Sequence, residues 1–192
     1  PVKSSFTEFP LFQLDRAVVA HFGVRAFGVH VNGFVQKQDG NLDLWIARRA
    51  KDRILCPSML DNMVAGGQPI GLGLMDNVIK ECDEEAAIPR KISETAIPVS
   101  AISYVMETES GLKPDTMFCF DLRLPDNFVP VNRDGEVANF YRWPVQQVAK
   151  IIDNGFEFKF NCNLVIIDFL IRHGFILPDH PQYIELIKGL RR

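Results

Sequence analysis

The stretch from Gly66 to Ile88 constrains the fold more than any other part of the chain. Gly66 and Gly67 form a turn in which the backbone can come close to a ligand, and the run from Leu74 to Ala87 has no internal Gly or Pro. This order predicts a strand or loop that leads into a helix. One face of the helix is apolar and is expected to anchor it against a core. The residues of that face are Met75, Val78, Ile79 and Cys82.

The same helix carries a cluster of acidic residues near its end. Glu81, Glu84 and Glu85 stand at i, i+3 and i+4, so their carboxylates converge within one turn. Like charges at this spacing repel, and the helix C-terminus disfavours anions. A divalent cation would offset that cost, since carboxylate oxygens are hard ligands of the kind that Mg²⁺ or Mn²⁺ takes. The alternative interpretation is an acidic helix end exposed to solvent.

The rest of the chain mixes strand and helix patterns. A length of 192 residues favours one domain, because domains hold roughly 150 residues. The patterns predict a short helix over 11–22, a hairpin of 26–35 and 43–49, strands over 101–106, 117–124 and 136–143, and helices over 144–152, 161–173 and 182–190. The fold class is therefore a mixed α/β or α+β domain.

Composition excludes several classes of partner. Lys and Arg number 21 against 24 Asp and Glu, a net charge of −3, which supplies no basic field for nucleic acid. The most apolar run, 164–171, is interrupted by Asp168 and is too short to span a membrane. The cysteines show no C-x-x-C spacing, which predicts the cytoplasm or another reducing compartment. The chain opens at Pro1 rather than Met, as a processed product or a fragment would.

The stretch that begins at Gly66 resembles the Nudix box, G-x5-E-x7-R-E-U-x-E-E-x-G-U, in which U is apolar. The residues that fit the pattern are Gly66, Glu81, Cys82, Glu84, Glu85 and Ile88. In that family a Glu and an Arg commonly form a supporting ion pair. Both partners are changed here, to Leu72 and Lys80, so the pair is replaced as a whole. Ala87 replaces a Gly, which leaves open a different exit turn from the helix.

The resemblance extends over most of the chain. Residues 45–49, 61–67, 80–87, 134–136 and 168–174 look like the Nudix subfamily related to the region preceding thiamine pyrophosphokinase in some fused proteins. This implies an α/β class of fold, a Nudix-like α/β/α sandwich with a mixed sheet and extra C-terminal helices. It also implies a Nudix domain over 23–192 and an N-terminal extension over 1–22, the remnant of a longer region.

The activity that the resemblance implies is metal-dependent hydrolysis of an organic diphosphate. The substrate would be thiamine diphosphate or one of its damaged analogues, which leaves the monophosphate. Mg²⁺ or Mn²⁺ would be held by Glu81, Glu84 and Glu85 with the Gly66 carbonyl, and would activate a water that attacks phosphorus. One of these glutamates or Glu136, which follows a turn at the start of a strand, would act as the general base.

Three basic residues are candidates for binding the phosphates, and Arg is suited to bidentate contact. They are Arg48, Arg49 and Lys51. Strand alternation places Arg48 and Arg49 on opposite faces of a sheet, so at most one of the two is expected in the site. The expected partner is a small-molecule diphosphate, with no nucleic acid and no membrane, and a homodimer is left open.

Two other functions compete with hydrolysis. A catalytically silent Nudix-like module for ligand binding or regulation would explain the departures at Leu72, Lys80 and Ala87, although such a module has no reason to keep three acids together. Diphosphate isomerisation would need a catalytic cysteine in a deep pocket, for which Cys56 is a weak candidate.

Overall fold

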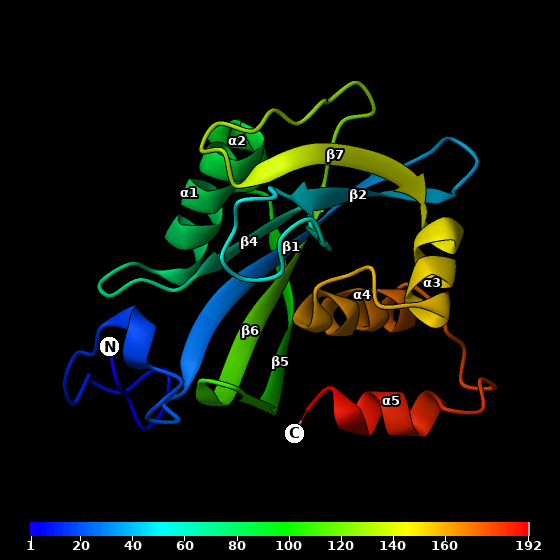
Figure 1. Ribbon diagram of the computed structural model, residues 1–192. Coiled ribbons are helices and arrows are strands. Elements are labelled where there is room, and N and C mark those ends of the chain that lie inside the picture. Colours follow the sequence, from blue (N-terminus) through cyan, green and yellow to red (C-terminus); the bar gives the residue numbers. More distant parts are fainter. Residues whose placement is uncertain (192) are drawn as a thin grey trace.

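A computed structural model describes residues 1–191 as a seven-stranded sheet with helices on both faces (Figure 1). The strands are β1 (Ala26–Gln36), β2 (Leu42–Arg49), β3 (Leu60–Asn62), β4 (Val64–Gly67), β5 (Ile97–Thr108), β6 (Gly111–Arg123) and β7 (Val137–Pro144). The helices are α1 (Leu74–Ala86), α2 (Arg90–Ser93), α3 (Val145–Asn154), α4 (Phe160–Arg172) and α5 (Tyr183–Gly189).

Strand β1 lies at the centre of the sheet. It pairs antiparallel with β2 and with β4, and parallel with β6. The strand order is β3-β2-β1-β6-β5, and β7 pairs with β2. Among the strand pairs within residues 1–191, the β1–β6 pair is parallel and the others are antiparallel, which makes the sheet mixed, as the resemblance to Nudix proteins implies.

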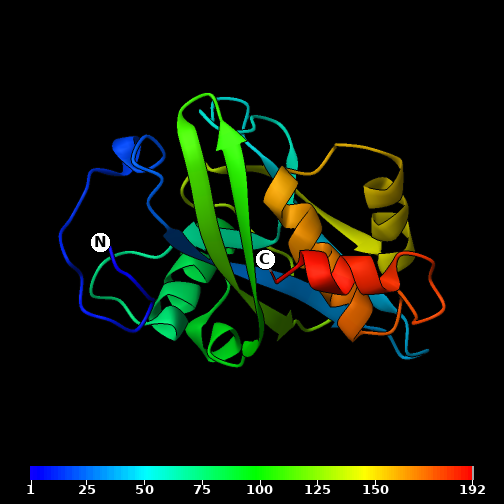
Figure 2. The same ribbon diagram turned by 90° about the horizontal axis from the view of Figure 1, so that it is seen from below.

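Two apolar cores lie on opposite faces of the sheet. On one face α1 packs on β1 through side chains that include Val31, Val78 and Cys82, and α2 adjoins it. On the other face α3 and α4 cover β2 and β3 through Leu44, Ile46, Val148, Ile166 and Phe169. Figures 1 and 2 show the helices of these two groups on either side of the sheet. The predicted α/β/α sandwich with extra C-terminal helices is confirmed.

The predicted elements from residue 26 onward are present, with shifted ends. The hairpin of β5 and β6 is tighter than predicted, because Thr108 pairs with Gly111 and the segment over 111–114 belongs to β6 rather than to a connector. Pro114 lies just before Asp115, where β6 begins to pair with β1 as well. The three C-terminal helices begin and end within two residues of the predicted bounds. Within residues 1–191, no helix is long and apolar enough to cross a membrane.

The helix predicted over 11–22 is wrong. The structure has only a 3₁₀ turn, η1 (Arg16–Val18), and residues 11 and 12 instead lie beside Val2, whose N–H donates to the Phe12 carbonyl at 2.9 Å. Helical spacing stabilises a helix only where its apolar face is packed, and here Phe12 and Phe22 stay exposed. Closer to the N-terminus, the ring of Phe6 contacts Phe27 of β1 and Phe118 of β6.

The exit turn of α1 keeps a left-handed conformation although Ala stands where the Nudix pattern has Gly. Ala87 has φ 51° and ψ 35°, and its N–H donates to the carbonyl of Asp83. The Ile88 N–H donates to the Cys82 carbonyl at 3.0 Å. The bond from Ala87 to Asp83 is that of the αL motif, in which a Gly ordinarily stands at this position. The different exit turn that the sequence left open is therefore not found.

We expect Ala87→Gly to stabilise the domain by about 0.5–1 kcal/mol, because the relief of left-handed strain exceeds the added entropy of the unfolded chain. Urea unfolding of the two proteins measures the difference. Ala86→Gly is the matched control and should destabilise by about 1 kcal/mol or more, since Ala86 is helical and buried. A loss of stability in Ala87→Gly would contradict this explanation of the turn.

Candidate active site

Glu85 is the acid of α1 that points into the protein. It is 7% exposed, and its Oε2 accepts a hydrogen bond at 2.9 Å from the backbone N–H of Ala65 in β4. Helix α1 holds it there because Val78 and Cys82, on the neighbouring turns of the same side, are fully buried. The apolar anchor predicted from the sequence therefore sets the position of this carboxylate.

Two further acidic side chains reach Glu85 from the segment before β7. Oxygen atoms of Glu85, Asp134 and Glu136 all lie within 4.8 Å of one another. The Glu136 N–H donates to Asp134 at 2.8 Å, which fixes the turn, and the Ala50 N–H donates to the Glu136 carbonyl at 2.9 Å. Three carboxylates from two distant segments thus meet, although only two of them, Glu85 and Glu136, were predicted as site residues.

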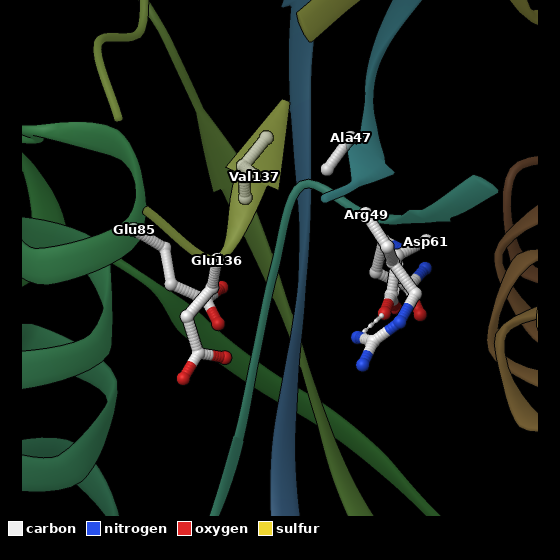
Figure 3. A pocket seen from close by; sticks show the side chains of 7 residues that line it. Ala47, Arg49, Asp61, Glu85, Glu136 and Val137 are labelled. Atoms are coloured by element: carbon white, nitrogen blue, oxygen red, sulfur yellow. Dashed lines mark hydrogen bonds and ion pairs between the residues drawn. The ribbon is translucent and has the colours of Figure 1, made fainter. Parts of the chain in front are cut away.

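A small pocket opens beside these acids. Figure 3 shows Glu85 from α1 and Glu136, which directly precedes β7, on one side, and the ion pair of Arg49 and Asp61 on the other. The residues that line it are Ala47, Arg49, Asp61, Asn62, Glu85, Glu136 and Val137. One edge of the pocket is therefore anionic and the opposite edge carries a guanidinium group.

Glu81 lies over the end of β4. A Cβ atom at Gly66 would come within 2.2 Å of the Glu81 carboxyl carbon, so the glycine leaves the space that this side chain occupies. Gly66 itself pairs with Val29 of β1. The structure thus places the predicted residues Gly66 and Glu81 in contact, one turn of α1 away from Glu85.

Glu84 lies apart from the buried acids. Its side chain is 46% exposed, and its Oε2 forms an ion pair with Lys80 at 2.6 Å. Lys80 also contacts Glu81 at 3.3 Å. The lysine therefore neutralises part of the acidic face, and Glu84 would have to release it in order to bind a cation.

A network of amides holds the loop between β4 and α1, where Leu72 replaces the acid of the Nudix pattern. The buried Asn77 side chain donates to the Gly67 carbonyl and to the Gln68 side chain, both at 3.1 Å. Gln68 in turn donates to the Leu72 carbonyl at 2.6 Å. Hydrogen bonds from Asn77 and Gln68 thus fix the loop without an ion pair. No motif or spacing in the sequence singles out Asn77.

The structure separates the three predicted phosphate-binding residues. Arg49 lines the pocket, whereas Arg48 lies outside it and donates to the Tyr141 hydroxyl at 3.2 Å and to the Ser58 carbonyl at 2.7 Å. Lys51 is exposed in the turn after β2. Only one of the two arginines faces the pocket, in keeping with strand alternation.

Behind the pocket lies a buried polar cluster of His30, Asp61 and Cys162, whose candidate ligand atoms lie within 4.8 Å of one another. Asp61 also forms ion pairs with Arg49 at 2.7 Å and with Lys159 at 3.6 Å. Burial lowers the pKa of His30 to about 4, so the imidazole is neutral at pH 7. The two cations beside Asp61 oppose the binding of a metal ion, which leaves the carboxylates at Glu85 as the candidate metal centre.

The electrostatics of that centre favour a bound cation. Burial raises the pKa of Glu85 well above its ordinary value, and it also raises the pKa of Glu81. The carboxylates of Asp61, Glu81 and Glu136 add to the rise at Glu85. A carboxylate in this position lacks a counter-charge that a divalent cation would supply.

Comparisons with known proteins agree with the fold and the motif. The chain matches no protein-family model. Two Arabidopsis thaliana proteins match it along its whole length: Nudix hydrolase 20, chloroplastic, with 49% identity over 191 residues, and Nudix hydrolase 24, chloroplastic, with 44% identity over 191 residues. The chain spans about half the length of each, 51% and 52%.

A solved structure shows the same fold. The NUDIX domain of Shewanella oneidensis NrtR, complexed with ADP ribose, superposes with a TM-score of 0.59 at 13% identity and covers 78% of this chain and 88% of its own. The chain is thus similar along its whole length to two plant proteins named as Nudix hydrolases, and it has the fold of the NrtR NUDIX domain.

Proposed function

We propose that this domain hydrolyses a diphosphate linkage in a small organic molecule, with Mg²⁺ or Mn²⁺ as the metal. The observation that carries the proposal is the convergence of Glu85, Asp134 and Glu136 at the edge of a pocket, with Glu81 on the same helix. The two plant relatives named as Nudix hydrolases support it.

The donor set fits a hard divalent cation. All the candidate side-chain ligands are carboxylate oxygens, the type that Mg²⁺ and Mn²⁺ take, and neither thiol nor imidazole intrudes. We propose that Glu81 and Glu85 hold the metal together with Asp134 and Glu136. The Gly66 carbonyl would complete the ligand set, as would Glu84 if it released Lys80.

The chemistry is hydrolysis by an activated water. A metal bound at these oxygens would neutralise phosphate charge and lower the pKa of a bound water. Glu81 and Glu136 are the two candidates for taking up its proton. Glu81→Gln and Glu136→Gln should both lower kcat, because each also removes a proposed metal ligand. The pH profile at saturating metal separates them, since only loss of the base removes its acidic limb.

For the substrate we propose thiamine diphosphate or one of its damaged analogues, with the monophosphate and phosphate as products. This rests on the subfamily that residues 45–49, 61–67 and 168–174 resemble. ADP ribose, the ligand of the NrtR domain, is the natural comparator, because it offers a diphosphate joined to a different organic group.

The direct test is an assay of phosphate and monophosphate release from a panel of diphosphates that includes thiamine diphosphate, an oxidised thiamine diphosphate and ADP ribose. We expect hydrolysis with Mg²⁺ or Mn²⁺, none with EDTA, and the largest kcat/KM for a thiamine compound. Binding without turnover across the panel would instead support a silent ligand-binding module.

A reducing compartment remains part of the proposal. The four cysteines are free, and three of them, Cys82, Cys119 and Cys162, are buried. Burial raises the pKa of Cys82 and of Cys119, to about 12 for Cys119, so both stay thiols at neutral pH. Inert buried thiols are consistent with a compartment in which thioredoxin and glutathione keep cysteines reduced.

We expect metal to stabilise the domain more at high pH than at low pH. The pKa of Glu85 is higher in the folded protein than in the unfolded chain. At a pH between these two pKa values, the folded metal-free protein therefore binds more protons than the unfolded chain. Its stability therefore falls as the pH rises through that window. A cation binds the ionised form and removes the penalty.

Thermal unfolding measures this effect. With Mn²⁺ at about 100 times its Kd, the gain is about 2.7 kcal/mol, or a rise in Tm of about 5–10 °C. The rise should be larger at pH 8 than at pH 5.5. Glu85→Gln should reduce the pH dependence of the shift, and Glu81, whose pKa is also raised, should account for what remains. An equal shift at both pH values in the native protein would contradict the assignment of Glu85.

A further inference from the structure

Arg53 lies in the loop that follows β2 and contacts the candidate metal centre directly. Its Nη1 forms an ion pair with Glu136 Oε1 at 2.7 Å, and the two side chains are 35% and 37% exposed. The backbone N–H of Ala50, at the start of the same loop, donates to the Glu136 carbonyl at 2.9 Å. The loop over 50–59 is thus joined to the edge of the centre by a side chain and by the backbone.

Arg49 and Arg53 differ in how many of their donors are engaged. Arg49 donates through Nε, Nη1 and Nη2 to the carbonyls of Leu55 and Cys56 and to Asp61. Arg53 makes its one ion pair, and its Nε is buried with no hydrogen-bond partner within residues 1–191. A guanidinium has five N–H donors, so Arg53 has donors to spare for a bidentate contact and Arg49 has few.

Arg53 occupies an oxygen that a cation would need. Glu136 belongs to the group of carboxylates with Glu85 and Asp134, so a divalent ion bound there competes with the guanidinium. Once displaced, Arg53 stays beside the centre. The backbone hydrogen bond from Ala50 to Glu136 still holds the loop there, because it does not depend on the Arg53 side chain. A diphosphate held by the metal would then offer oxygens in the bidentate geometry that Arg prefers.

Arg48 and Arg49 hold backbone carbonyls of the second half of the loop, but the loop tip next to Arg53 has little apolar packing to resist such a movement. Ile54 is 97% exposed and Leu55 is 62% exposed, so its tip buries little apolar surface. Cys56 and Ser58 have φ values of 51° and 58°, which are unfavourable for residues with a side chain. A segment with few buried contacts and local backbone strain belongs to the part of a fold that rearranges at low cost.

We propose that Arg53 is a substrate-binding residue, held by Glu136 in the free protein and transferred to the diphosphate when metal and substrate bind. The inference rests on the proposed function, because it needs a metal at Glu136. It assigns the phosphate contact to a residue outside the three that the sequence predicts.

Two binding measurements test this inference without turnover. The first is titration of Mn²⁺ alone, and the second is titration of methylenediphosphonate, a diphosphate that is not hydrolysed, at a fixed concentration of free Mg²⁺. The variants are Arg53→Ala and Arg53→Lys. The control is Arg90→Ala, which removes an exposed arginine that pairs with Glu94 at 3.9 Å.

We expect Arg53→Ala to bind Mn²⁺ as tightly as the native protein or up to about fivefold more tightly, and methylenediphosphonate about tenfold more weakly. Arg53→Lys should lie between the two, since it keeps the charge and loses the bidentate contact. Arg90→Ala should match the native protein in both titrations. A merely structural role of Arg53 would weaken both ligands together.

The inference is overturned if Arg53→Ala loses Mn²⁺ affinity or keeps the native affinity for methylenediphosphonate. If the native protein hydrolyses diphosphates and Arg53→Ala binds both ligands unchanged, this inference fails while the proposed function stands. If Arg53→Ala keeps or gains Mn²⁺ affinity and loses methylenediphosphonate affinity, but the native protein hydrolyses no diphosphate, the proposed function fails and this inference stands. A native protein that binds no Mn²⁺ overturns both.

Discussion

Glu85→Gln is expected to lower the rate of diphosphate hydrolysis by about 10²–10³-fold, because it removes one of the converging carboxylates that would hold the metal. The amide oxygen of glutamine can still accept the Ala65 N–H, so the helix and strand should keep their positions. The unliganded variant should be at least as stable as the native protein, since a buried charge with a raised pKa is gone. Lower activity together with unchanged or higher stability separates a functional effect from a folding defect.

The matched control for Glu85→Gln is the same substitution at a glutamate outside the site. Glu94 lies at the end of α2 and pairs with Arg90 at the surface, so Glu94→Gln should leave kcat and KM unchanged. Steady-state assays at saturating Mg²⁺ measure both variants. A rate for Glu85→Gln within about twofold of the native rate would exclude Glu85 from the catalytic machinery.

Asp61→Ala is expected to destabilise the domain by about 3–5 kcal/mol, because it leaves two cations beside a buried site without their counter-charge. Asp61 is buried and contacts Arg49 and Lys159 as well as the thiol of Cys162, whose Sγ lies 2.6 Å from Oδ1. Burial opposes the charge on Asp61, but Lys159 and the other partners outweigh it and lower the pKa of this carboxyl below its usual range. The carboxylate therefore stays ionised and anchors Arg49 at the pocket.

Urea unfolding measures the loss in the free energy of unfolding. Two further variants test whether the loss comes from the buried charges. Asp126→Ala removes an ion pair with Arg142 from an aspartate whose side chain is 82% exposed, and should cost about 0.5 kcal/mol or less. Lys159→Met in the Asp61→Ala background should recover part of the stability, because it removes one of the unpaired cations. If Asp61→Ala and Asp126→Ala cost the same, the buried charge cluster does not stabilise the fold.

The part of the site that lies on one helix was predictable from the sequence. The spacing of Glu81, Glu84 and Glu85 and the apolar face with Val78 and Cys82 are properties of helical periodicity, and α1 realises them. Periodicity alone did not separate the buried Glu85 from the exposed Glu84 with its ion pair to Lys80. That difference depends on which side of the helix meets the sheet.

The loop residues of the site could not be derived in the same way. Asp134 and Arg53 reach the centre through turns whose conformations follow from tertiary contacts, among them the bond of Ala50 to Glu136. The spacing of Asp134 and Glu136 was visible in the sequence and is the pattern from which a second acid could have been inferred. The prediction of a helix over 11–22 was wrong for a related reason. Apolar side chains of this segment, such as Phe12 and Phe22, are exposed rather than packed against the core.

The most direct test of the central claim is anomalous diffraction from crystals soaked in Mn²⁺. We expect a strong peak among the carboxylates of Glu85, Asp134 and Glu136, with metal–oxygen distances of about 2.1–2.3 Å and the Arg53 side chain moved away from Glu136. A peak confined to the His30, Asp61 and Cys162 cluster, or no peak in native crystals at a Mn²⁺ concentration that supports hydrolysis, would contradict the account.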